Sequence, residues 1–557
     1  MRLTSSTWLA FLALSAPAIA VIDNPKLVLP WGTWEGQPLA DEDNIILFKN
    51  VRFGAEPERF STPSFPTSSD NTVYKSFGQE SLSCIQIDRT AAEHPPGGDN
   101  PIGEDPNGTQ TEDCLFLDLY VPKSALAGGP STPSLPVVVW IYGGAYAFGS
   151  KDQEGPLYTG RALLRAAQYK TIFVVGNYRV GAFGWLAGHY MEQVGQPNAG
   201  LYDQALLLQW VQQYIHLANG DPKPFQTFFA QSPAFEWAWD NSPGGRLDHI
   251  FSQFSKLAGC EGDYDIDCLR TASIETLRRA NQDLFDAVRQ TGLFPVGPAV
   301  DGKWIKSIPA VTLSQNKVWK GVGPSIISHC ENEAYSFTPK NVNSQASFDK
   351  FLETFLPGTA LAPERLAIRQ RYNCTEPPSN GDYNNCLRLV IQDGFFTCNT
   401  RNLFDAYPSS SRMISYGFPT SGYAYHAADL IPLFMNNADE AKALLIKIGI
   451  SSFFAGLYAA SLNQTVAPVY QNCLASFAAT GDPNANLGGL DPPPGVASWS
   501  TADGSTDALS GVLQVRAAAG QEPYVLISDS QNTKNTCAFW TGIAKDIVSG
   551  SAQHDEL

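Results

Sequence analysis

Two uninterrupted apolar runs constrain the fold of this chain more than any other feature. Residues 135–142 read Leu-Pro-Val-Val-Val-Trp-Ile-Tyr, and residues 171–176 read Thr-Ile-Phe-Val-Val-Gly. Continuous rather than alternating apolar residues are typical of strands buried on both faces of a mainly parallel sheet. Residues 200–217 place apolar side chains on one helical stripe and predict a helix. This order of strands and helices predicts an α/β fold with right-handed crossovers.

The two ends of the chain predict a route through the secretory pathway. Arg2 precedes an uncharged run, Trp8–Ala20, that closes in Ala-Ile-Ala, the pattern of a cleaved signal peptide. Residues 554–557 spell His-Asp-Glu-Leu, which an ER retrieval receptor binds. We therefore expect a signal peptide at 1–20, one domain at 21–553, and a retrieval tail at 554–557. The expected location is the ER lumen, with secretion if retrieval fails.

Cysteines and glycosylation sequons agree with an oxidising compartment. The chain has ten cysteines, an even number that allows complete pairing. Asn-x-Thr sequons predict glycosylation at Asn107, Asn373 and Asn463. The net charge of −17 argues against a nucleic-acid partner. No later apolar run approaches the ~20 residues of a membrane span, and no His-Glu-x-x-His or clustered Cys-x-x-Cys motif indicates a metal, so neither metal nor cofactor is predicted.

A glycine-rich turn follows the first apolar strand. It reads Tyr-Gly-Gly-Ala-Tyr over residues 142–146, and such a turn can direct backbone N–H groups at an oxyanion. Taken alone, a glycine-rich segment after a strand is more often only a turn. The motifs around it decide the interpretation, and they occur in this order: Thr111-Glu-Asp-Cys-Leu-Phe-Leu117, Val139-Trp-Ile-Tyr-Gly-Gly144, Asn177-Tyr-Arg-Val-Gly181, Ala199-Gly-Leu-Tyr-Asp-Gln-Ala205, Gln209-Trp-Val-Gln212, Gly220-Asp-Pro222 and Gly481-Asp-Pro-Asn484.

Together these motifs closely resemble the type-B carboxylesterase/lipase family, the cholinesterase-like branch of the α/β-hydrolases, over about residues 29–540. The resemblance implies a single domain of the α/β-hydrolase fold, with a mainly parallel, doubly wound sheet and helices on both faces. It also implies hydrolysis of small carboxylic esters through serine, glutamate and histidine. By motif, Glu333 matches the family's acid and His426 its base. The oxyanion donors would be the N–H groups of Gly144 and Ala145, where the family usually has a further glycine in place of Ala145.

The resemblance also implies two disulfides, and sequence proximity suggests a third. Family positions pair Cys84 with Cys114 and Cys260 with Cys268. Cys374 and Cys386 are close enough in sequence to form a third pair. Four cysteines stay unassigned: Cys330, Cys398, Cys473 and Cys537. The loop between Cys84 and Cys114 resembles the family's flap over the active site. It is polar, which predicts a preference for soluble esters over interfacial lipolysis.

The family's nucleophile is missing from this sequence. After Gly220-Asp-Pro222 the family continues into a strand, a Gly-x-Ser-x-Gly elbow and a helix. Here Lys223 alone separates Pro222 from Pro224, no Gly-x-Ser-x-Gly occurs anywhere, and roughly thirty residues, about one βα unit, are absent. Ser232, in Ala-Gln-Ser-Pro-Ala, is a weak substitute because Pro233 lacks the N–H that usually follows the nucleophile.

Three explanations of this gap stay open: coding sequence lost in a gene model or by splicing, a real pseudoenzyme, or a diverged site. The sequence favours an ester hydrolase of the ER lumen whose serine-bearing segment is missing from this chain. The alternative is a non-catalytic binding protein on the same fold. Intact motifs around Glu333 and His426 favour the enzyme, because a site long inactive has no reason to keep them.

Overall fold

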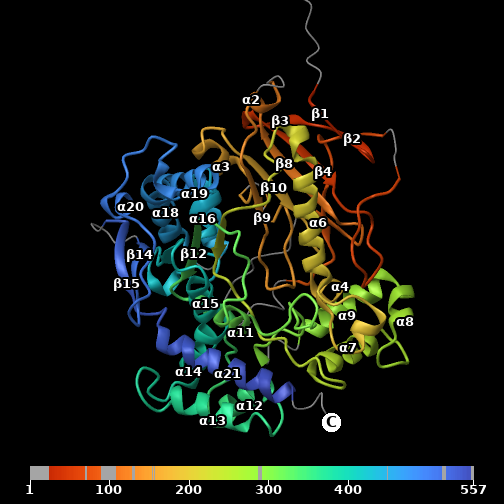
Figure 1. Cartoon of the computed structure of the whole chain (residues 1–557), viewed down its shortest axis with the longest axis vertical. Coiled ribbons are helices and arrows are strands. Elements are labelled where there is room, and N and C mark those ends of the chain that lie inside the picture. The colour runs from red at the N-terminus through yellow and green to blue at the C-terminus, as the bar shows by residue number, and fades with distance from the viewer. Residues whose placement is uncertain are drawn as a thin grey trace, which may run out of the picture.

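The computed structural model describes residues 24–68, 72–88, 108–127, 132–153, 155, 157–286, 291–447, 450–516 and 522–552. Ten of its strands form two five-stranded sheets, which lie at the upper right and at the left of Figure 1. In the N-terminal sheet only β9 and β10 pair in parallel, and the other neighbours are antiparallel. The order in this sheet is β3 (Gln37–Leu39), β4 (Glu42–Arg52), β8 (Phe116–Pro122), β10 (Ile172–Gly176), β9 (Val137–Trp140).

The C-terminal sheet is parallel except at its outer edge. Strands β11 to β14 run parallel to one another, and only β15 is antiparallel to its neighbour. The predicted parallel pairing is therefore found between β9 and β10 and among β11 to β14, whereas the pairs that involve β3, β4, β8 or β15 are antiparallel. The order is β11 (Phe228–Gln231), β12 (Ser325–Cys330), β13 (Ser411–Tyr416), β14 (Leu509–Val515), β15 (Tyr524–Asp529).

We define the seam as the space between β9 and β11, edge strands of the N-terminal and C-terminal sheets. Within the described residues, neither strand pairs with the other. Every residue of β9 and β11 is only half-buried, whereas β10 and β12 are buried throughout. At the start of β9, Leu135 forms a parallel bridge with Gly220, and its N–H donates to the Asn219 carbonyl at 2.9 Å. The segment at Gly220 therefore begins to run beside β9 and then turns away from it.

Alternate residues of β10 pack against helices on opposite sides of the N-terminal sheet. Ile172 and Val174 share a core cluster with Leu207 and Trp210 of α6 (Ala199–Tyr214), the helix that the sequence predicts at 200–217. Phe173 and Val175 belong to the other core cluster, which includes side chains of α19 (Ala467–Thr480). The predicted burial on both faces is thus present in this strand.

Helices form the remaining layers and the lower part of Figure 1. Trp540 of α21 is fully buried in a core cluster with side chains from α12 and α14. The other helices are α2 (Lys123–Leu126), α3 (Arg161–Ala166), α4 (Gly181–Trp185), α5 (Met191–Val194), η1 (Ile215–Ala218), α7 (Arg246–Leu257), α8 (Ile266–Thr271), α9 (Ile274–Asp286), α11 (Pro309–Ser314), η2 (Glu333–Phe337), α12 (Gln345–Phe355), α13 (Ala362–Arg371), α14 (Tyr383–Ile391), η3 (Gln392–Thr397), α15 (Cys398–Ala406), η4 (Ser421–Tyr423), α16 (Leu430–Phe434), α17 (Ala438–Lys447), α18 (Ser452–Ser461), η5 (Leu462–Val466), η6 (Pro483–Ala485), α20 (Pro494–Ala497) and α21 (Lys534–Ala552).

Five short strands complete the N-terminal part: β1 (Lys26–Leu29), β2 (Gly32–Glu35), β5 (Val73–Lys75), β6 (Ser81–Cys84) and β7 (Gly108–Thr111). Among the helices that the structure describes, none is long and apolar enough to cross a bilayer. Cys330 and Cys473 are buried free thiols, so the even cysteine count does not lead to complete pairing. The structure contains both disulfides that the resemblance implies, the pair suggested by proximity, and a fourth: Cys84–Cys114, Cys260–Cys268, Cys374–Cys386 and Cys398–Cys537.

Candidate active site

Glu333 and His426 meet at the end of two neighbouring parallel strands. Glu333 opens η2 directly after β12, and His426 lies in the loop that follows β13 and η4. Parallel neighbours place the residues that follow them at the same edge of the sheet. A bridge between Asn332 and Tyr425 holds the two loops together, with the Asn332 N–H donating to the Ala424 carbonyl at 3.0 Å. The imidazole Nδ1 consequently lies 2.6 Å from Glu333 Oε2.

Electrostatics favour the charged form of both partners. Burial alone would raise the pKa of Glu333, but the neighbouring imidazole and the Cys330 N–H, 2.6 Å from Oε1, bring it below its usual value. Burial alone would lower the pKa of His426, and the Glu333 charge and hydrogen bond raise it above its usual 6.5. The rings of Phe337 and Phe396 pack against the imidazole at 5.4 and 5.1 Å. The pair is therefore pre-oriented, and the carboxylate stabilises a protonated imidazole.

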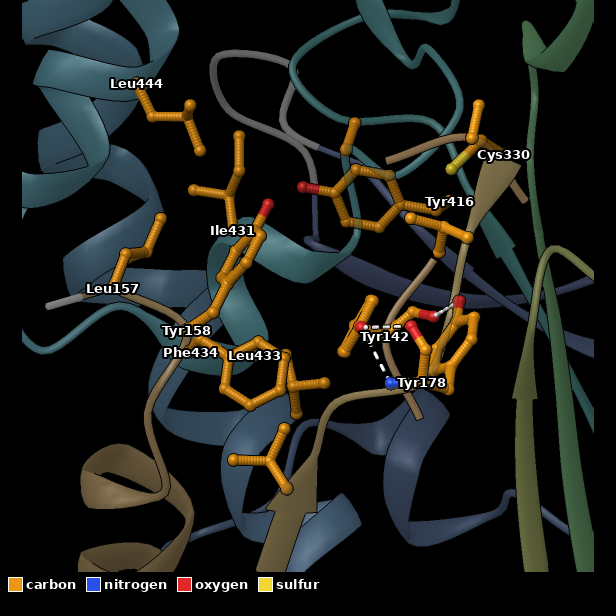
Figure 2. Close-up of a cluster of buried hydrophobic side chains, with 14 of the residues drawn as sticks. Tyr142, Leu157, Tyr158, Tyr178, Cys330, Tyr416, Ile431, Leu433, Phe434 and Leu444 are labelled. Atoms are coloured by element: carbon orange, nitrogen blue, oxygen red, sulfur yellow. Dashed lines mark hydrogen bonds between the residues drawn. The ribbon is translucent and has the colours of Figure 1, made fainter. Parts of the chain in front are cut away.

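The imidazole faces a large apolar cavity. His426 keeps 27% of its side chain exposed and lines a cavity of about 670 Å³. Within the described residues, Nε2 makes no hydrogen bond. Tyr142 and Tyr178 form part of the cavity wall; their rings stack at 4.5 Å, and the Tyr178 hydroxyl donates to the Tyr142 carbonyl at 2.7 Å (Figure 2). The free nitrogen is thus available to a group bound in the cavity.

The glycine-rich turn after β9 lines the same cavity. Gly144 has φ 135°, and a Cβ there would lie 2.0 Å from the Phe148 carbonyl oxygen, so only glycine fits. Ala145 and Tyr146 follow in the left-handed region, with φ 51° and 64°. In the described part of the chain, the N–H groups of Gly144 and Ala145 donate to no other residue. The backbone turn leaves two donors free beside the cavity.

Ser232 lies near the same pair but on the side of the acid. It follows β11, is buried, and has φ 46°. Its hydroxyl lies 3.9 Å from Cys330 Sγ and beside Glu333, whose pKa it helps to lower. Among the described contacts, none joins Ser232 to His426. Together with Pro233, which has no N–H, this geometry argues against Ser232 as the attacking group.

Two further carboxyl groups at the site escaped the sequence analysis. Asp429 is buried three residues after His426 and accepts hydrogen bonds from Gln231 and Ser328 at 2.9 and 3.1 Å. Glu236 lines the cavity, where burial outweighs Arg246 and raises its pKa to about 7. A carboxylate three positions after the candidate base was a usable signal for Asp429. Nothing in the sequence distinguishes Glu236.

The remaining predicted sites are exposed or lie outside the described residues. Asn373 and Asn463 are exposed, and the Asn373 side chain accepts from the Thr375 N–H at 3.2 Å. Asn107, most of the flap, residues 1–20 and residues 554–557 lie outside the described part of the chain. Within the part that is described, no three His, Cys, Asp or Glu side chains are grouped so as to hold a metal ion.

Comparison with known proteins identifies the family. Residues 23–232 and 223–540 match the model of the carboxylesterase family. The chain belongs to this family. A secreted lipase of Arthroderma benhamiae is 32% identical over 486 residues, which cover 81% of this chain and 88% of that protein. Carboxylesterase patB of Penicillium expansum is 28% identical over 557 aligned positions, covering 86% of this chain and 91% of the relative.

The fold agrees with the family. The crystal structure of Aspergillus niger EstA superposes with a TM-score of 0.72 at 22% identity, covering 94% of this chain and 99% of that one. The predicted family and the α/β-hydrolase fold are therefore confirmed, and the family to which the chain belongs is one of serine hydrolases. The assignment of individual residues to catalytic roles stays a prediction.

Proposed function

We propose that the complete form of this protein hydrolyses carboxylic esters in the ER lumen with a Ser-Glu-His triad, and that the serine-bearing segment is missing from this chain after Pro222. The observation that carries the proposal is the contact between the buried Glu333 and the half-buried His426, 2.6 Å apart, with Nε2 free beside an apolar cavity. A mere structural histidine would be expected to use both ring nitrogens or to be shielded from the cavity.

The chemistry follows from these positions. A serine hydroxyl attacks the ester carbonyl carbon while Nε2 of His426 accepts its proton, and Glu333 stabilises the imidazolium that forms. The N–H groups of Gly144 and Ala145 donate to the developing oxyanion, and the third donor would be the N–H after the serine. The imidazolium then protonates the leaving alcohol. Water attacks the acyl-serine by the same route and releases the carboxylic acid.

The seam supports the position of the missing segment. The chain starts along β9 at the Leu135–Gly220 bridge, leaves after Pro222, and resumes strand pairing only at Phe228 of β11. One additional parallel strand along β9 would pair the open edges of both sheets. The match to the family model is likewise divided, into 23–232 and 223–540, at this place in the chain. A βα unit inserted here would bring a serine to the cavity mouth, between Ala145 and His426.

A non-catalytic binding protein is the second candidate. The absence of any Gly-x-Ser-x-Gly segment favours it. The pre-oriented Glu333–His426 pair and the free N–H groups of Gly144 and Ala145 favour the enzyme, because binding alone requires neither.

Sequencing of cDNA across the codons for Pro222 to Phe225 separates the two candidates. The enzyme requires transcripts with an in-frame strand, elbow and helix at this point. If every transcript encodes Asp-Pro-Lys-Pro-Phe, the binding protein is the better account. We call this longer chain the restored chain and the chain of 557 residues the printed chain. Expression of the restored chain should then give ester hydrolysis that the printed chain lacks.

Residence in the ER lumen is the cellular part of the proposal. The four disulfides, and a relative named a secreted lipase, support passage through the secretory pathway. Residues 554–557 support retrieval from it. The glycans of the protein should remain sensitive to endoglycosidase H, and deletion of residues 554–557 should release the protein into the medium. Abundant secretion of the unaltered protein would contradict retrieval.

A further inference from the structure

The large cavity contains one carboxyl group that the proposed catalytic steps do not use. Among the described residues that line this cavity, Glu236 is the only Asp, Glu, Lys or Arg. It lies in the loop between β11 and α7 and keeps only 10% of its side chain exposed. Most other side chains of the wall are aromatic or aliphatic. Because a carboxylate in such surroundings costs free energy unless it is hydrogen-bonded, the partners of Glu236 determine what it can do.

Two neighbours hold the Glu236 carboxyl group in place. The Phe294 N–H donates to Oε2 at 2.9 Å, and the Arg246 guanidinium donates to Oε1 at 3.3 Å. Arg246 also donates to the Phe294 carbonyl at 3.2 Å, so the two charged side chains fix the backbone of that residue. A carboxylate has about four lone-pair positions, and within the described residues these two bonds are its only hydrogen bonds. Glu236 therefore keeps acceptor capacity for a group bound in the cavity.

Glu236 lies beside the glycine-rich turn, whereas phenylalanine side chains connect it to the imidazole only indirectly. The hydroxyl of Tyr146, in that turn, donates at 2.8 Å to the carbonyl of the residue two positions before Glu236. The rings of Phe294 and Phe337 lie 6.2 Å apart, and Phe337 packs against His426 at 5.4 Å. The alcohol oxygen of a bound ester must lie at Nε2 of His426 to take up its proton. The part of the substrate that reaches Glu236 is therefore the acyl part.

Charge balance at Glu236 favours a neutral hydrogen-bond donor over a charged group. Among the described residues, Arg246 of α7 and Tyr146 of the turn are the charged and titratable side chains that interact with it. Because Arg246 already balances the ionised carboxyl group, an acyl ammonium group would be buried without a counter-charge of its own. The carboxylate would repel an anionic acyl group. A hydroxyl group carries no charge, and it can donate to the free acceptor positions of Glu236.

We propose that Glu236 selects esters whose acyl part carries a hydroxyl group, by accepting a hydrogen bond from that hydroxyl. The inference rests on the proposed esterase function and names the substrate class of the same cavity. Without a partner, a hydroxyl that enters an apolar cavity loses its hydrogen bonds to water and binds less well than a methyl group of similar size. The carboxylate replaces the lost bond with a charge-assisted one, so it makes the hydroxylated ester the better substrate. A purely structural Glu236, which only holds Phe294, would not distinguish the two esters.

Two pairs of ethyl esters test this selection in the restored chain. Each pair differs only in a hydroxyl or a methyl group on the acyl chain: ethyl 3-hydroxybutanoate with ethyl 3-methylbutanoate, and ethyl 6-hydroxyhexanoate with ethyl heptanoate. The two chain lengths sample different reaches from the carbonyl carbon to Glu236. At pH 8, kcat/KM should be about tenfold higher for the hydroxylated ester of at least one pair. We call this quotient the hydroxyl preference.

Variants at Glu236 separate selection from support of the fold. Glu236→Leu should reverse the hydroxyl preference, and Glu236→Gln, which keeps an acceptor for the Phe294 N–H, should remove most of it. Loss of packing around Phe294 would slow both esters of a pair alike and leave the quotient unchanged. Gln204→Leu is the matched control, because it removes another polar side chain of the cavity wall and should leave the hydroxyl preference intact.

The hydroxyl preference should also depend on pH. Burial outweighs Arg246 and raises the pKa of Glu236 to about 7, so the carboxyl group is ionised and accepts best above that pH. The preference should therefore rise from pH 6 to pH 8, while the titration of His426 affects both esters equally and cancels. Absence of the preference from both pairs in the unaltered restored chain would overturn the inference, and so would an unchanged preference in Glu236→Leu.

A third pair tests the assignment to the acyl part. In 3-hydroxybutyl acetate and 3-methylbutyl acetate the same two groups lie on the alcohol part, and we expect no hydroxyl preference between them. A preference here that Glu236→Leu removes would overturn the assignment. If the restored chain hydrolyses none of these esters, the proposed function fails and the inference fails with it. Hydrolysis without any hydroxyl preference would contradict the inference alone.

Discussion

The N-terminal and C-terminal sheets contribute to the same cavity but end differently at the seam. The C-terminal sheet places Glu333 and His426 after two strands that are each paired on both sides. The N-terminal sheet places Gly144 and Ala145 after β9, an edge strand that is only half-buried. Glu333 and His426 therefore depend on strands that are paired on both sides, whereas the turn at Gly144 and Ala145 follows a strand that is paired on one side only within the described residues.

The difference shows how a site assembled from two sheets can be interrupted without losing its local parts. Glu333 and His426 are held by β12 and β13, and neither strand borders the seam. On the proposed function, the missing parts belong between β9 and β11: the nucleophile, its N–H, and the hydrogen bonds that would join the sheets. Open edges of this kind expose unpaired N–H and C=O groups and favour aggregation. We therefore expect the printed chain to fold poorly and the restored chain to fold well.

The largest effect is expected from removing the base in the C-terminal half. In the restored chain, His426→Ala should lower kcat/KM for p-nitrophenyl acetate by about 10^4-fold or more, as removal of a triad member does in serine hydrolases. His216→Ala, at an exposed histidine, is the control. A loss of less than about tenfold would mean that His426 is not the proposed base. The C-terminal sheet would then supply no more of a complete catalytic site than the N-terminal sheet does.

A second histidine tests the rigidity of the C-terminal sheet. His329, on β12, is buried with its Nε2 2.8 Å from Asp529, at the end of β15. Burial opposes the charge of His329, but Asp529 raises its pKa to about 9; burial likewise opposes the charge of Asp529, and His329 lowers its pKa to about 2. The histidine stabilises the fold fully below 6.5 and loses this contribution as the pH rises through 9.

His329→Gln in the restored chain should therefore lower the free energy of unfolding by about 3 kcal/mol at pH 6, because it leaves Asp529 buried without its partner. The loss should shrink above pH 9, where the unaltered chain also lacks the imidazolium. Urea unfolding at the two pH values measures the effect, with His216→Gln as the control. An equal loss at both pH values would mean that charge does not hold β12 to β15.

The pH profile of the restored chain gives a smaller effect. His426 must be neutral to accept a proton, and Glu333 raises its pKa above 6.5. Below that pKa, kcat/KM should fall about tenfold per pH unit. Titration of selectively labelled histidine by NMR should show this pKa move downward in Glu333→Gln. An unchanged pKa would mean that the carboxylate does not act on the imidazole.

The smallest effect concerns the N-terminal half. Ala145 has φ 51°, a conformation that costs a non-glycine residue about 1–2 kcal/mol. Ala145→Gly removes this strain but increases the freedom of the unfolded chain, so the restored chain should gain only about 0.5 kcal/mol. Ala147→Gly, at a buried residue without a positive φ, should instead destabilise. A loss of stability in Ala145→Gly would show that the turn is not strained.

Sequence reasoning found the parts of the molecule that local pattern determines. Continuous apolar runs located β9 and β10, helical periodicity located α6, and family motifs brought forward Glu333 and His426. It could not find the division into two sheets, because on the proposed function the strand that would pair with β9 is missing from this chain.

Sequence reasoning could not find long-range contacts either. The Cys398–Cys537 disulfide joins residues 139 positions apart, and no local pattern relates α15 to α21. The exposed apolar side chains of α18 were missed for a different reason. Periodicity identifies apolar residues on a helix, but it cannot tell which of them the tertiary structure leaves in solvent, as it does Phe453.

Labelling with a fluorophosphonate tests the central claim most directly, because this reagent reacts with an activated serine. The printed chain has Glu333 and His426 in place but no serine for them to activate, so we expect no label. The restored chain should be labelled stoichiometrically at the inserted serine, and His426→Ala should abolish the reaction. Stoichiometric labelling of the printed chain at Ser232, lost in His426→Ala, would contradict the account, because the site would then be complete without the missing segment.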